Sequence, residues 1–150
     1  MGPPLLLSLF IRRTFMTTIT TRSGKGSPLT NAEVDANFTN LNTDKLELTV
    51  RSTTSNATLT PASDDTQYIV TALAVNATIS APSGTPVNGH KLLLRIKDNG
   101  TSRTLTWNAI YRALGVTLPT ATTASKVLYI GCSYNSTAVK WDVIAVSEEA

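Results

Sequence analysis

The residues best suited to chemistry in this sequence are few and widely separated. His90 is the only histidine and Cys132 the only cysteine. One histidine and one cysteine cannot supply the four nitrogen and sulfur ligands that structural zinc usually takes. His90 follows Asn88 and Gly89 at a predicted strand start, which favours a surface position. Cys132 lies in an apolar strand pattern, which favours a small buried hydrophobe, and a single cysteine excludes an intramolecular disulfide.

The remaining polar clusters also have ordinary structural explanations. Asp64 and Asp65 follow Pro61 in a turn, where aspartates are common; a calcium site is the less favoured alternative. Glu148 and Glu149 form an acidic C-terminal end. Residues 24–27, Gly-Lys-Gly-Ser, lack the spacing of a phosphate-binding loop, which needs four residues between its first glycine and Gly-Lys. Because catalysis needs a base together with a nucleophile or a metal, the sequence predicts no enzyme, no cofactor and no metal.

Composition points to β-structure with a weakly charged surface. Charged residues make up 15% of the 150 residues, whereas threonine occurs 25 times, and β-branched threonine suits strands. The formal net charge is only +3, and no basic stripe interleaved with aromatic residues is present. The sequence therefore predicts no nucleic-acid binding, and its length allows one domain of about 100 residues with appendages.

A helix is predicted over residues 29–50, with strong start signals. Thr30 is a suitable N-cap, and Glu33 can complete a capping box. Leu29 and Val34 are spaced for a hydrophobic staple. Beyond the cap, apolar residues recur in steps of four and three, the period of a coiled coil. Phe38 and the other seam positions follow this period: Asn31, Val34, Phe38, Leu41, Lys45 and Leu48.

A helix of this length with one narrow apolar seam is marginal alone in water, so it needs a partner. Oligomerisation through the seam is the favoured interpretation. The alternative is packing of the seam on the chain's own C-terminal domain.

Residues 1–28 are predicted to form an extended N-terminal arm. The run is not a secretory signal, because its arginines follow rather than precede the apolar residues, and it is too short to span a bilayer. We expect no membrane insertion and favour docking of this arm on a neighbouring subunit or another protein. The candidate contact residues are Leu5, Leu6, Leu7, Leu9, Phe10, Ile11, Arg12, Arg13, Arg22 and Lys25.

Residues 51–150 are predicted to form an antiparallel β-sandwich or jelly-roll-like domain, after a polar hinge at 51–56. Alternating apolar residues in 90–97 and 139–146 indicate half-buried strands. The turns at 98–100 and 134–137 are expected to join antiparallel neighbours. The full set of expected strands is 57–60, 66–72, 77–80, 90–97, 103–107, 126–133 and 139–146. The fold class is mainly β, with an extended arm and one short coiled-coil helix.

Two parts of the chain resemble structural proteins of tailed bacteriophages. Residues 26–42, Gly-Ser-Pro-Leu-Thr-Asn-Ala-Glu-Val-Asp-Ala-Asn-Phe-Thr-Asn-Leu-Asn, are similar to a segment recurrent in tail-fibre and head-fibre proteins. The run from Leu92 to Val146 is similar to a small β-domain that closes many phage virion proteins. The resemblance implies a homotrimer in which the helices form a three-stranded bundle and the β-domains point outward. The chain lacks the long shaft of a tail fibre, which favours a compact knob.

These observations predict a virion surface protein on the capsid exterior, a trimeric decoration, cement or head-fibre protein that contacts the major capsid protein. One alternative is a tail fibre or tail-tip adaptor that contacts tail proteins, with a β-knob that binds a host surface glycan or another receptor. A second alternative is a free-standing carbohydrate-binding module or a small hydrolase.

Overall fold

The computed structural model describes residues 19–43 and 48–150, and the chain divides into two compact units, one up to Glu47 and one from Leu48. The mainly-β class predicted from the sequence is confirmed. The predicted boundary between helix and β-domain at residues 50 and 51 lies close to this division. The two units are described separately.

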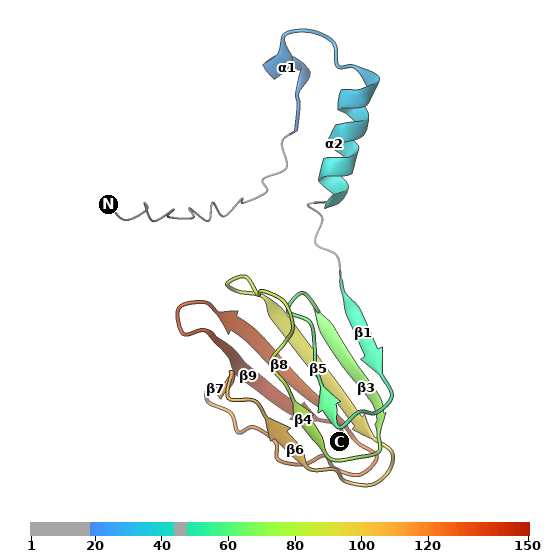
Figure 1. Ribbon diagram of the computed structural model, residues 1–150, viewed down its shortest axis with the longest axis vertical. Helices are drawn as coiled ribbons and strands as arrows, with labels where there is room; N and C mark the ends of the chain where they lie inside the picture. The colour runs from blue at the N-terminus through green and yellow to red at the C-terminus, as the bar shows by residue number, and fades with distance from the viewer. Residues whose placement is uncertain (1–18, 44–47) are drawn as a thin grey trace, which may run out of the picture. The chain divides into compact units, whose positions relative to one another are not determined.

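The N-terminal unit contains a short helix α1, Arg22–Lys25, and a longer helix α2, Asn31–Thr43 (Figure 1). The side chain of Thr21 caps α1 by accepting a hydrogen bond from the backbone N–H of Gly24, and Gly26 ends that helix with a φ of 73°. This left-handed backbone favours glycine. The chain then turns into α2 through residues 27–30.

The capping box predicted at the start of α2 is present. The backbone N–H of Thr30 donates to the Glu33 carboxylate at 2.7 Å, and the backbone N–H of Glu33 donates to the Thr30 hydroxyl at 3.3 Å. These reciprocal bonds satisfy two donors that helix geometry leaves unpaired. The sequence therefore located the start of α2 correctly.

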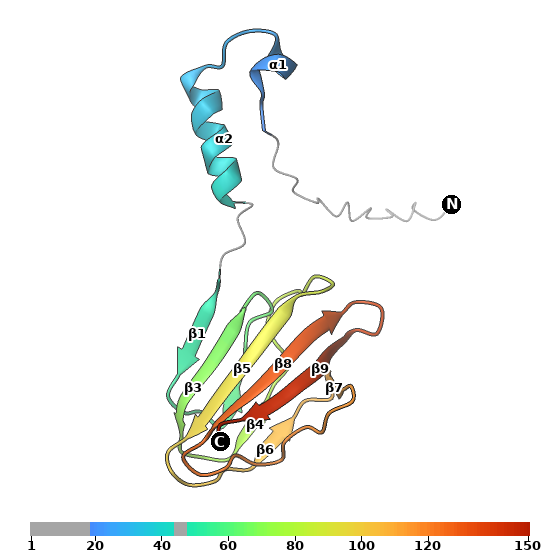
Figure 2. The same cartoon turned by 180° about the vertical axis from the view of Figure 1, so that it is seen from behind.

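The second unit is a β-domain of two sheets. Its strands are β1 Val50–Thr53, β2 Thr58–Leu59, β3 Gln67–Leu73, β4 Ala77–Ile79, β5 Lys91–Asp98, β6 Leu105–Trp107, β7 Tyr111–Ala113, β8 Val127–Asn135 and β9 Lys140–Glu148. Six strands form one sheet in the order β1-β3-β5-β8-β9-β7, and three form a second in the order β2-β4-β6. Figure 1 shows the smaller sheet in front of the larger one, and Figure 2 shows the larger sheet from behind.

The first six strands alternate between the two sheets, so the chain winds like a short two-sided solenoid. Each strand pairs in parallel with the strand two positions later: β1 with β3 and β3 with β5 in one sheet, and β2 with β4 and β4 with β6 in the other. Only β5, β8 and β9 pair antiparallel, and β7 joins β9 in parallel. The expectation of an antiparallel sandwich is therefore corrected to a mixed sheet facing a parallel one.

The core lies between the two sheets and follows the alternation read from the sequence. On β5, Leu92, Leu94 and Ile96 are buried, and the intervening side chains face outward. The smaller sheet contributes Leu59, Ile79 and Leu105 to the same cluster. Burying each large apolar side chain contributes about 1.5–3 kcal/mol, so this cluster holds the two layers together.

Two strands and one connection differ from the sequence-based prediction. The segment expected to be a polar hinge contains β1, which pairs along Gln67–Val70 of β3. The three residues of β7 were not expected as a strand. The turn after Asp98 does not close a hairpin, because β5 and β6 belong to different sheets. The hairpin expected at 134–137 does join β8 to β9 antiparallel.

Candidate functional site

The outward face of α2 carries the apolar seam predicted from the sequence. Val34, Phe38 and Leu41 follow one another at steps of four and three, which places them within about 60° around a helix of 3.6 residues per turn. Val34 is half-buried, whereas Phe38 is 69% exposed and Leu41 57% exposed. Two large apolar side chains open to solvent on one helix face form a surface that a partner can bury.

The other predicted seam residues have different positions. Asn31 is exposed at the first residue of α2. Lys45 lies outside the described residues. Leu48 is exposed but not helical, because it lies in the irregular segment just before β1. The prediction of a helix to residue 50 is therefore wrong for its last three residues, and the heptad pattern is carried by 31–41 alone among described side chains.

Polar residues of α2 bind the segment that precedes α1, which the sequence did not reveal. The Asn37 side chain accepts a hydrogen bond from the backbone N–H of Thr20 and donates one to the carbonyl oxygen of the same residue, both at 2.8 Å. Asn37 thus binds both backbone polar groups of Thr20. The only signal for this contact in the sequence was the presence of asparagine within the predicted helix, because asparagine is unfavourable in helix interiors.

Glu33 adds an electrostatic contact four residues before Asn37. Its carboxylate accepts a hydrogen bond from the Lys25 ammonium group, besides those from the backbone N–H and hydroxyl of Thr30. The Lys25 contact first, and then the two from Thr30, lower the pKa of Glu33 to about 2. Glu33 therefore remains ionised, which also suits the positive end of the α2 dipole.

Only two of the predicted arm residues fall in the described part of the chain. Arg22 and Lys25 both lie in α1, so the prediction of an extended arm is wrong for residues 22–25, and Lys25 is already paired with Glu33. The other eight, Leu5, Leu6, Leu7, Leu9, Phe10, Ile11, Arg12 and Arg13, lie outside the described residues.

The residues of the β-domain whose side chains could take part in chemistry have structural roles. Cys132 is buried, and burial raises the pKa of its thiol to about 12, so the reactive thiolate is disfavoured. His90 is half-buried, and its Nδ1 lies 2.9 Å from the carbonyl oxygen of Ser63. His90 lies just before β5 and Cys132 lies within β8, and no hydrogen bond joins the two side chains among the described residues.

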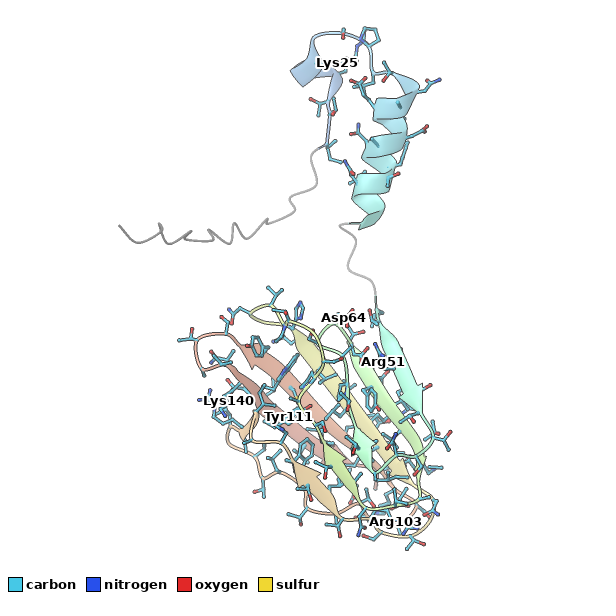
Figure 3. The ribbon with its side chains drawn as sticks, in the orientation of Figure 1. Lys25, Arg51, Asp64, Arg103, Tyr111 and Lys140 are labelled. Carbon is cyan, nitrogen blue, oxygen red and sulfur yellow. The ribbon has the colours of Figure 1, made fainter. Side chains whose placement is uncertain are left out.

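The paired aspartates divide into one exposed and one buried side chain. Asp64 is exposed (labelled in Figure 3), whereas Asp65 is buried. The Asp65 carboxylate accepts a hydrogen bond from the backbone N–H of Ala62 at 2.7 Å, and it forms an ion pair with Arg51 at 3.2 Å. It therefore holds the turn before β3 and ties β1 to that turn.

Within residues 19–43 and 48–150, no group of three or more histidine, cysteine, aspartate or glutamate side chains is arranged to hold a metal ion. No helix in these ranges combines the length and the apolar character needed to cross a membrane.

A shallow polar hollow of about 360 Å³ lies beside the β8–β9 hairpin. Asp142 forms part of its wall, and its carboxylate accepts two hydrogen bonds from Arg112, at 2.8 and 3.0 Å, and one from Asn135 at 3.2 Å. The remaining wall residues are amides, hydroxyls and backbone: Asn88, Gly89, Ser133, Tyr134, Asn135 and Thr137. Such a lining suits a hydroxylated ligand better than an apolar one.

Comparisons with known proteins identify no relative. No protein-family model matches this chain, and no curated protein and no solved structure is significantly similar to it. Its function is therefore inferred from its own residues.

Proposed function

We propose that this chain is a non-enzymatic virion surface protein of a tailed bacteriophage, a trimeric capsid decoration, cement or head-fibre protein attached through its N-terminal arm. The proposal rests on the resemblance of residues 26–42 to a segment of phage fibre proteins and on one structural observation. That observation is the exposure of Phe38 and Leu41 on one face of α2.

The seam is better suited to other copies of the same helix than to solvent. Burying Phe38 and Leu41 recovers about 1.5–3 kcal/mol for each side chain. The neighbouring face of α2 is already engaged, because Glu33 and Asn37 bind residues 20–30 of the same chain. An identical seam from two further copies supplies the period and the size that knobs-into-holes packing requires.

A trimer explains why a small protein would bind a shell firmly. Three arms joined by one helix bundle bind a symmetric lattice with far greater avidity than one arm. Closed threefold symmetry also matches the local threefold positions of a capsid. Arms that bridge capsid subunits would stabilise the assembled shell by mass action, because they bind only the assembled form.

Replacing Phe38 and Leu41 together with aspartate is expected to convert a trimer to a monomer, because three buried pairs of carboxylates would meet in the bundle. Light scattering should report a threefold lower mass. The matched control is Ala36→Asp, which adds the same charge on the opposite side of α2, where Ala36 is exposed, and should leave the trimer intact. A wild-type protein that is already monomeric, or an unchanged mass in the double variant, contradicts the proposed bundle.

Deleting residues 1–15 is expected to leave a soluble trimer that no longer decorates purified capsids. The comparison is made by co-sedimentation of full-length and truncated protein with undecorated shells. Full decoration by the truncated protein would reject attachment through the arm, whereas failure of the full-length protein to sediment would reject the capsid as its site.

A tail fibre or tail-tip adaptor is the second candidate, and the polar hollow between Asn88 and Asp142 favours it. A receptor-binding knob needs such a surface, and a host glycan has the hydroxyl groups to use it. Counting copies on labelled particles separates the two roles, because a decoration protein occurs in many copies and a tail component in few.

A further inference from the structure

The outer face of the six-stranded sheet has no strand or helix of the β-domain over it (Figure 2). Alternation places Leu93 and Arg95 of β5 on this face, since Leu92, Leu94 and Ile96 are buried on the other. Tyr129 of β8 and Ile69 of β3 share the face by strand register.

A row of three side chains crosses the centre of this face. Arg95 pairs in register with Ile69 on one side and with Tyr129 on the other. Adjacent strands lie about 4.8 Å apart, so the register places the Arg95 side chain between an aliphatic and an aromatic neighbour. Arg95 is half-buried there, and no hydrogen bond or salt bridge to it is present within the described ranges. An arginine has five N–H donors, and those of Arg95 have no acceptor among the described residues.

The neighbouring row provides a low apolar step. Leu93 lies in register with Gly131, and Gly131 with Ala145. Gly131 has no side chain, so the surface between Leu93 and Ala145 lies lower than its surroundings. A partner's apolar side chain placed on this step would lie one row from the Arg95 guanidinium.

The charges around the row favour an anionic partner. Lys91 and Lys97 lie on the same face of β5 as Arg95 and are exposed. Asp142 near this face is paired with Arg112, whereas Glu149 accepts a hydrogen bond from the neutral backbone N–H of Val127 at 3.1 Å and keeps its charge. No salt bridge of Lys91, Arg95 or Lys97 is present within the described residues, so the central strand presents three cations with no carboxylate paired to them.

We propose that this face, the β5 face (Ile69, Lys91, Leu93, Arg95, Lys97 and Tyr129), binds an acidic protein surface that carries an apolar anchor beside its carboxylates. A symmetric contact of this face with the same face of a second copy does not fit, because the cations of β5 would oppose one another across it. A polysaccharide also fits less well, since Ile69 and Leu93 offer no hydrogen bonds to hydroxyl groups. The proposal does not depend on the role in a virion.

The test uses the full chain and a random copolymer of glutamate and tyrosine as an acidic, apolar polypeptide probe, with binding followed by fluorescence anisotropy. We expect saturable binding that weakens as salt rises. The affinity should be about tenfold lower for Arg95→Glu, because the carboxylate introduced at position 95 would face the carboxylates of the bound copolymer instead of pairing with them. The matched control, Lys140→Glu, makes the same charge change on β9, two strands away from β5 in the sheet (Lys140 is labelled in Figure 3), and should alter the affinity less than about twofold.

Arg95→Gln removes the positive charge but keeps a polar end on a methylene stem, and it guards against a folding defect. It should melt like the wild type and still lose several-fold in affinity. Absence of saturable copolymer binding, or equal losses in the Arg95 and Lys140 variants, overturns the proposal. Tighter binding of heparin than of the copolymer, with the same dependence on Arg95, overturns it in favour of an anionic polysaccharide.

Discussion

Replacing Trp141 with alanine is expected to lower the free energy of unfolding by about 3–5 kcal/mol, the cost of emptying a large aromatic site in a core. The Trp141 side chain is completely buried. Its strand lies between β7 and β8, where Tyr111 and Tyr134 are its register partners. The ring centroids of Trp141 and Tyr134 are 5.3 Å apart, so the cavity would also remove an aromatic contact. Because small domains are stable by only about 5–15 kcal/mol, this variant loses a large share of its stability.

Two further variants show whether volume or polarity dominates at this site. The indole Nε1 of Trp141 is buried and has no hydrogen-bond partner among described residues. Trp141→Phe removes that unpaired donor and leaves a smaller cavity, so its loss should be only about 1–2 kcal/mol. Ile144→Ala changes an exposed residue of the same strand and should stay within about 0.5 kcal/mol. Urea denaturation measures all three; equal losses at Trp141 and Ile144 would contradict the assigned core.

Replacing Asp98 with alanine is expected to cost about 2–4 kcal/mol, because three donors would lose their acceptor. The buried carboxylate of Asp98 accepts hydrogen bonds from the backbone N–H of Gly100 at 2.9 Å, the backbone N–H of Ser125 at 2.8 Å and the hydroxyl of Thr122 at 2.7 Å. It joins the end of β5 to the loop before β8. Asp98→Asn should cost less, about 1–2 kcal/mol, because its amide oxygen can retain the two backbone donors while the Thr122 hydroxyl turns to accept.

The same residue predicts part of the acid sensitivity of the domain. Burial raises the pKa of Asp98. The hydrogen bonds from Ser125, Thr122 and Gly100 lower this pKa by more than burial raises it, so the net pKa is below the ordinary value. Its stabilising contribution is therefore complete above the unfolded-state pKa, near 4, and is lost as pH falls through the folded-state pKa. Asp98→Asn should flatten the acid limb of stability measured by urea denaturation against pH, whereas the exposed control Asp64→Ala should not. An unchanged acid limb in Asp98→Asn would contradict this assignment.

The strands of the core were predictable because their alternation is strong, whereas their pairing was not. Leu92, Leu94 and Ile96 identify β5 without reference to any partner. The turn after it, Asp-Asn-Gly, has the composition of a hairpin. Yet the Asp98 side chain binds the loop at 122–125, and the chain crosses to the other sheet. A long-range contact thus decided the topology, and local turn chemistry does not encode it.

The two missed strands are short and depend on their neighbours. β1 is polar, but parallel pairing with β3 and the ion pair between Arg51 and Asp65 hold it in place. β7 spans only three residues and pairs with β9 alone. In the N-terminal unit the capping box could be predicted because its partners are three residues apart. The contact between Asn37 and Thr20 joins residues seventeen apart, with no sequence period to reveal it.

The position of β9 between β8 and β7 constrains when the domain can form during synthesis. Strands β1 to β6 can wind coil by coil as they leave the ribosome, since each of β3 to β6 pairs with the strand two positions before it. β7, however, has no neighbour in its sheet until residues 140–148 emerge, and Trp141 reaches the interior only then. A nascent chain arrested before that point would display an open sheet edge next to an unfilled hydrophobic interior, the kind of surface on which chaperones act.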